Sequence, residues 1–161
     1  MSKAEMRKQL EFARKKSLDL LDTIAKRPDA AALLAWRPGP GRAHIAWQLM
    51  HVGATDDRHL NVRIGGKTAK EPENEKRFAG GSTPDDTIPS VDEIRKYLLA
   101  HREALLALLD ASSEEELAKK PYEQSTFTLE EWFRVWNWHE AHHHGQAHLT
   151  FNMYKAAHPA A

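Results

Sequence analysis

The chain has 161 residues, about the length of one domain with a single hydrophobic core. Hydrophobic residues make up 41% of it and charged residues 29%, a composition typical of globular proteins. Lysine plus arginine and aspartate plus glutamate both number 23, so the net charge is zero with neutral histidines, which argues against a nucleic-acid-binding protein. Because cysteine is absent, any metal site must use histidine or carboxylate ligands.

Two amphipathic helices are predicted in the first half of the chain. The first covers residues 4–27, where apolar residues recur every three to four positions until Pro28 ends the pattern. A connector rich in proline and glycine follows at residues 36–41. The second helix covers residues 42–64 and ends before a pair of glycines.

Residues 65–89 have a different character, with four glycines, three prolines and no periodicity. A long irregular segment inside a compact domain usually has a structural or functional role. We expect this segment to cross the length of a helical bundle, so that the helices before and after it run parallel.

Capping boxes mark the beginnings of the remaining helices, because a serine or threonine is followed three residues later by a glutamate. Such pairs occur at Ser90 and Glu93, Ser113 and Glu116, and Thr128 and Glu131. The first pair opens a third long helix, the second a short turn, and the third a last helix that ends near residue 156. With no sustained strand-like alternation, four long helices predict a single all-α domain over residues 1–161, a four-helix bundle with a long crossover between helices two and three.

Residues 132–151 of the last helix contain five of the ten histidines. Because each helical residue advances by about 100°, the side chains of His139 and His143 fall in the middle of the apolar face. His142 falls at its margin, and His144 and His148 are predicted to be in solvent. A buried imidazole needs a partner, which in most cores is a side chain or a water molecule.

A third histidine comes from the second helix, where His51 lies beside Trp47 at the border of the apolar face, with Thr55 one turn away. Two inward histidines one turn apart can place two ring nitrogens on one ion. With a third inward histidine on another helix, a metal site becomes the better interpretation. The sequence therefore predicts a metal site with the ligands His51, His139 and His143.

The string His139-Glu140-x-x-His143 is also the signature of zincin metalloproteases, in which the glutamate is the general base. No acidic residue follows Glu140, so a downstream carboxylate ligand is impossible. Gly145 and His148 each stand one residue before the positions of the extended motif. A protease is therefore not favoured.

The strings HEAHHHGQ at residues 139–146 and HIAWQLMH at residues 44–51 resemble the DinB-like superfamily. These four-helix-bundle proteins include bacillithiol- and mycothiol-dependent S-transferases, and they hold a metal with one histidine of helix two and two of helix four. The resemblance matches His51, His139 and His143 to those ligands and Gln146 to the glutamine of the family. It also implies a homodimer.

A divalent ion on three neutral histidines, whether zinc, nickel or iron, keeps a net positive charge and open positions, as in catalytic sites. Such an ion can activate a bound water or thiol. The resemblance favours a metal-dependent S-transferase, in which a low-molecular-weight thiol attacks a small electrophile. The alternatives are a non-catalytic metal- or ligand-binding stress-response protein and a metal-dependent hydrolase. Residues predicted to line the pocket or support the ligands are Trp47, Thr55, Trp136, His142 and Gln146.

The N-terminal residues include no apolar signal region, and no apolar run approaches the ~20 residues of a membrane span. We therefore expect a cytoplasmic protein whose partner is a small-molecule substrate, with no nucleic acid and no membrane involved.

Overall fold

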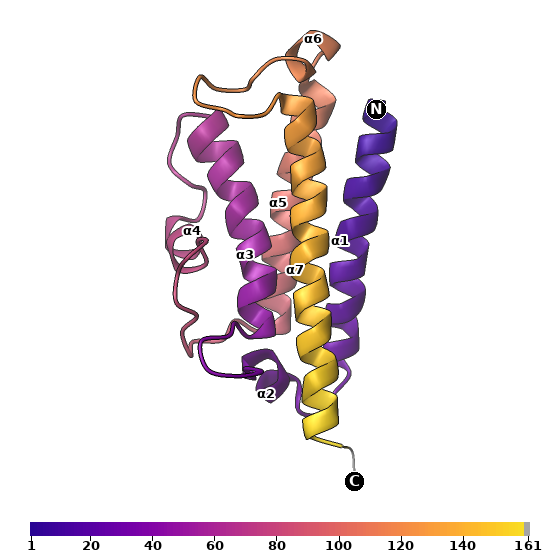
Figure 1. Cartoon of the computed structure of the whole chain (residues 1–161), viewed down its shortest axis with the longest axis vertical. Helices are drawn as coiled ribbons and strands as arrows, with labels where there is room; N and C mark the ends of the chain where they lie inside the picture. The colour runs from indigo at the N-terminus through magenta and orange to yellow at the C-terminus, as the bar shows by residue number, and fades with distance from the viewer. Residues whose placement is uncertain (160–161) are drawn as a thin grey trace.

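The computed structural model describes residues 1–159 and shows an all-helical bundle (Figure 1). The long helices are α1 (Lys3–Ala25), α3 (Ile45–Asp57) with its continuation η1 (Arg58–Ile64), α5 (Val91–Ala111) and α7 (Leu129–Ala157). Short helices lie in the connections, namely α2 (Ala30–Ala35), α4 (Pro72–Arg77) and α6 (Glu114–Leu117). None of the helices within residues 1–159 is both long and apolar enough to span a bilayer. Ala160 and Ala161, the end of the predicted domain, lie outside the described residues.

The direction of the helices confirms the predicted crossover. Helix α3 packs against α5 and α7, and α1 also packs against α5 and α7. In Figure 1, α1 and α7 descend while α3 and α5 ascend, because the segment that includes α4 returns alongside α3 from one end of the bundle to the other. The fold is thus a four-helix bundle with parallel second and third long helices.

Three predicted capping boxes are present in the structure. The side-chain oxygens of Ser90, Ser113 and Thr128 each accept a hydrogen bond from the backbone N–H of the glutamate three residues later. A fourth box, Ser2 with Glu5, opens α1 and was not predicted. Each box satisfies backbone groups that a helix start otherwise leaves unpaired, so these helices begin where the sequence indicates.

The second long helix begins later than predicted, at Ile45 instead of residue 42. Its N-cap is His44, whose Nδ1 accepts a hydrogen bond from the Trp47 backbone N–H at 3.0 Å. Histidine is not among the usual N-cap residues, and so the start is missed by capping rules. At its other end the helix widens into the π-helical turns of η1, in which the Gly65 N–H bonds to the Leu60 carbonyl.

The crossover is anchored by Asp57, a fully buried carboxylate at the end of α3. Its Oδ1 accepts hydrogen bonds from the Asn61 side chain at 2.7 Å and the Lys70 backbone N–H at 2.8 Å. Its Oδ2 accepts from the Glu71 backbone N–H at 3.0 Å. One buried side chain therefore satisfies two backbone donors of an irregular segment. These hydrogen bonds hold the first part of the crossover against the end of α3.

The core contains a charged layer, defined by Arg14, Asp56, Arg102 and Glu140, whose side chains are at most 5% exposed. Arg14 on α1, Arg102 on α5 and Glu140 on α7 each lie between residues of two separate apolar clusters. The Arg14 guanidinium lies 3.3 Å from Asp56 and 2.7 Å from Glu140, and Arg102 also pairs with Glu140. Burial raises the pKa of Asp56 to about 6. This layer was not predicted.

Candidate metal centre

His51 on α3 and His139 and His143 on α7 converge where these two helices pack against each other. One possible ligand nitrogen from each ring lies within 4.8 Å of the other two. The Nε2 atoms of His51 and His139 are 3.2 Å apart. Two nitrogens that bind one ion tetrahedrally at ~2.1 Å are roughly 3.4 Å apart, so this trio could hold a metal ion with little movement.

Hydrogen bonds orient two of the three rings. The Nδ1 atom of His51 lies 2.6 Å from the Phe78 carbonyl oxygen, and the Nδ1 atom of His143 lies 2.6 Å from the Gln48 Oε1. Both oxygens only accept, so each ring must donate from Nδ1. That tautomer leaves the Nε2 lone pairs free, which is the usual arrangement around metal-binding histidines. The Nδ1 atom of His139 is buried without a partner among the described residues.

Burial also keeps the three rings neutral. It is the main cause that lowers the pKa of His139 to about 4 and that of His143 to about 3, and neighbouring histidines lower both further. The pKa of His51 is lowered by burial as well. Because a protonated imidazole cannot bind a metal, these pKa values leave all three rings able to coordinate at neutral pH.

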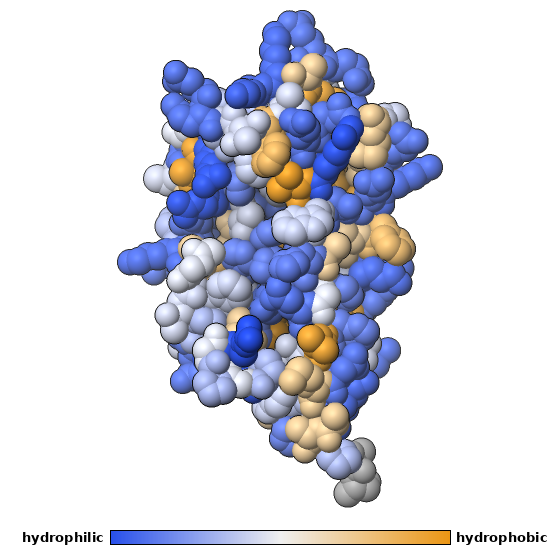
Figure 2. Space-filling view, in the orientation of Figure 1, coloured by the Kyte–Doolittle hydropathy of each residue, from blue (hydrophilic) through white to orange (hydrophobic). Residues whose placement is uncertain are grey.

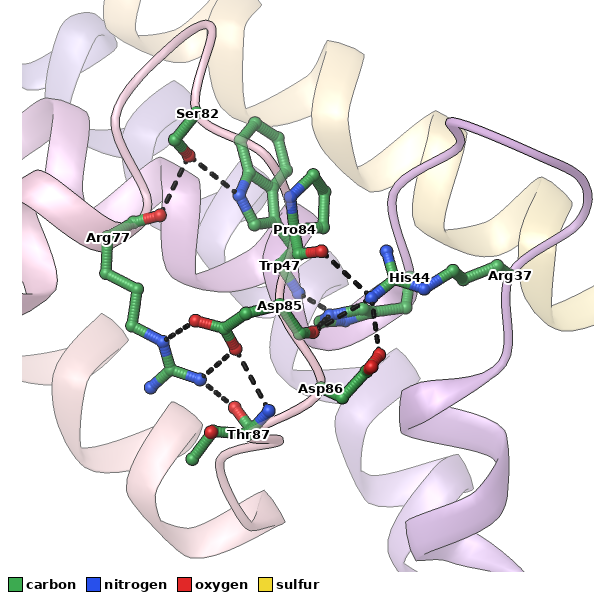
Figure 3. Close-up of polar contacts among 9 residues, drawn as sticks. All are labelled: Arg37, His44, Trp47, Arg77, Ser82, Pro84, Asp85, Asp86 and Thr87. Carbon is green, nitrogen blue, oxygen red and sulfur yellow. Dashed lines mark hydrogen bonds and ion pairs between the residues drawn. The ribbon is translucent and has the colours of Figure 1, made fainter.

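Trp47 covers one face of the trio. Its ring stacks on His51, with centroids 4.7 Å apart and planes at 8°. The indole Nε1–H donates to the Ser82 Oγ at 3.2 Å, and this hydroxyl donates to the Arg77 carbonyl at 2.8 Å (Figure 3). The crossover therefore holds the tryptophan against the metal-binding ring.

The same part of the crossover is tied to the start of α3 (Figure 3). Since the His44 Nδ1 accepts from the backbone, its Nε2–H donates to the Asp85 carbonyl at 3.0 Å. The Asp85 carboxylate pairs with the Arg77 guanidinium through two contacts of 2.6 Å. The Arg37 guanidinium donates to Pro84, Asp85 and Asp86. These contacts close the crossover over one side of the site.

The remaining predicted pocket residues differ in their burial and in the residues that they contact. His142 is exposed, stacks on Trp138 and accepts a 2.6 Å hydrogen bond from the Gln146 amide. Thr55 is half-buried, and its carbonyl accepts from His59. Trp136 is buried in an apolar cluster, where it packs against His59, Trp132 and Phe133. His148 is exposed as predicted, whereas His144 is half-buried, because α1 lies beside it.

Glu140 faces away from the trio, into the charged layer, and is completely buried. It is one residue from His139, which on a helix is a rotation of about 100°. Two arginines hold its carboxylate, so it is not placed as a general base for chemistry at His139 and His143. The geometry agrees with setting aside the protease interpretation.

A comparison of the sequence with models of known protein families identifies the family of the chain. The sequence matches the family model of the DinB superfamily over residues 9–147. The chain belongs to the DinB superfamily. The match begins within α1, ends within α7 and includes all three histidines of the trio. A search of curated proteins finds no match to this DinB-superfamily chain.

The Gln48 hydrogen bond leads to a prediction for this DinB-superfamily protein. Replacing Gln48 by leucine removes the acceptor that selects the His143 tautomer, and we expect Zn²⁺ affinity to fall about 10–100-fold. Competition with a chromophoric chelator measures the affinity. The matched control is Gln146→Leu, because Gln146 bonds to His142 and not to the trio. Equal affinity in wild type and Gln48→Leu would show that this hydrogen bond does not support metal binding.

Proposed function

We propose that the protein is a metal-dependent S-transferase, which joins a low-molecular-weight thiol to a small electrophile. The observation that carries the proposal is the convergence of three neutral histidines from two helices, with two rings oriented by acceptors. The cluster contains no carboxylate. A divalent ion bound there would keep its full charge and lower the pKa of a thiol, which supplies a thiolate nucleophile at neutral pH. Membership of the DinB superfamily supports this choice of reaction.

The residues of the chain have distinct parts in this reaction. Gln48 and the Phe78 carbonyl orient two ligands, and Trp47 shields the His51 ring from water. Glu140 takes no part in proton transfer, because it is paired with Arg14 and Arg102. The thiol proton therefore passes to solvent. The thiolate sulfur forms a bond to the electrophilic carbon, the bond from that carbon to the leaving group breaks, and the leaving group departs with that electron pair.

The test is conjugation of a thiol to a chromogenic chloronitrobenzene by the zinc-loaded protein. Glutathione, bacillithiol and mycothiol are compared at neutral pH, and His143→Ala is compared with the control His148→Ala. We expect one thiol to be conjugated by wild type and His148→Ala, with a rate at least about 100-fold lower in His143→Ala, since that variant lacks a ligand. If the zinc-loaded wild type conjugates none of the three thiols, the S-transferase proposal is wrong and a binding protein becomes the better interpretation.

A further inference from the structure

A surface hollow of about 600 Å³ adjoins the trio on the side of the C-terminal half of α7. Gln48 and Gln146 belong to its lining. Gln48 is also the residue that accepts the hydrogen bond of His143, so one side chain links the hollow to the trio. We call this space the Arg42 hollow, because Arg42 also belongs to its lining.

The Arg42 hollow is positively charged. Arg42 is the charged residue of its lining, and no aspartate or glutamate among residues 1–159 contributes to it. The ion pairs formed within the described part of the chain do not include Arg42. Most other arginines of the protein have a carboxylate partner, as Arg37 and Arg77 do. A guanidinium without a partner, beside a candidate reaction centre, is suited to bind an anion.

The rest of the lining is apolar or uncharged. Leu149 and Met153 are 61% and 41% exposed, although both are large hydrophobic side chains. Figure 2 shows hydrophobic side chains along the C-terminal half of α7, on the face toward the viewer. A ligand that covered these side chains would bury apolar surface, which is favourable, while its charged end paired with Arg42.

We propose that the Arg42 hollow binds the carboxylate end of a small organic anion whose other end reaches the three-histidine site. Arg42 pairs with the carboxylate, and Leu149 and Met153 contact the aliphatic part of the ligand. The identity of the reacting end, a thiol, rests on the proposed function; the carboxylate specificity rests on Arg42. The site would therefore select acidic small molecules over neutral ones of the same length.

The experiment uses Co²⁺-loaded full-length protein, because a thiolate that binds cobalt produces a charge-transfer absorption band. Mercaptohexanoate and mercaptohexanol are titrated against the protein and differ in one charged group. We expect the acid to bind roughly three- to tenfold more tightly than the alcohol, the size of one exposed charge-assisted contact. In Arg42→Gln this preference disappears while the affinity for the alcohol stays the same. The matched control is Arg134→Gln, which removes one arginine from the distant first turns of α7.

Each result decides one of the two proposals. Equal affinity of wild type for acid and alcohol, or an unchanged preference in Arg42→Gln, would overturn the role of the hollow while the proposed function stands. If neither thiol produces the band, and glutathione, bacillithiol and mycothiol produce none either, the proposed function fails. Calorimetry with hexanoate and hexanol then tests the hollow separately, and hexanoate binding that is lost in Arg42→Gln but kept in Arg134→Gln would support it. Binding that does not depend on Arg42 would refute it.

Discussion

Replacing Glu140 by glutamine is expected to lower the free energy of unfolding by about 3–5 kcal/mol. The Glu140 side chain is 0% exposed and lies between the Arg14 and Arg102 guanidiniums. A neutral amide in its place leaves two buried positive charges with Asp56 as their remaining carboxylate partner. Removing one partner of a buried ion pair costs this much because the remaining charge is left without a counter-charge and without solvation by water. For a chain of this length the melting temperature should fall by roughly 6–20 °C.

The matched control is Glu130→Gln on the same helix. Glu130 also has two positive partners, Arg134 and the N-terminal amine, but it lies at the surface. Surface ion pairs contribute about 0–1 kcal/mol, so this variant should unfold almost like wild type. Urea denaturation of the metal-free proteins, followed by circular dichroism, measures both. If Glu140→Gln costs no more than Glu130→Gln, the charged layer does not stabilise the bundle as described.

The charged layer also shows where prediction from the sequence ends. His139 and His143 were predictable as a pair because they share a face of a regular helix, whose geometry fixes the direction of each side chain around the helix axis. His51, on another helix, was matched to them through the resemblance to the DinB-like superfamily. Glu140 occupies the same regular helix as that pair, yet its burial depends on two arginines from other helices. Which charged residues on separate helices meet depends on the axial register of the packed helices, and periodicity does not reveal that register.

The crossover was the least predictable part of the site. Its length and glycine content indicated a connection across the bundle, which is confirmed. The contact between the Phe78 carbonyl and His51 could not be predicted, since every residue has a carbonyl group and an irregular segment has no periodicity to orient it. Gln48 is a different case. It precedes His51 by three residues on the same helix, so the spacing rule that paired His139 with His143 could have identified it.

Replacing His51 by alanine is expected to weaken Zn²⁺ binding by more than about 100-fold, because removing a group that only supports a ligand already costs about 10–100-fold. The variant keeps His139 and His143, one turn apart on α7, and loses the nitrogen from α3. Competition with a chromophoric chelator measures the affinity, and His148→Ala is the control because His148 is an exposed histidine of α7. An affinity for His51→Ala within a few-fold of wild type would mean that α7 alone holds the ion.

The His51→Ala variant also tests whether the metal is held between two helices or by one helix alone. An ion held by His51, His139 and His143 links α3 to α7, and it binds the folded chain in preference to the unfolded one. Zinc at about 100 times its dissociation constant should then stabilise the folded wild type by about 2.7 kcal/mol. The melting temperature of wild type and His148→Ala should rise accordingly on adding zinc, by several degrees. His51→Ala should show almost no rise at the same zinc concentration, since the two histidines left on α7 bind too weakly to favour the folded state.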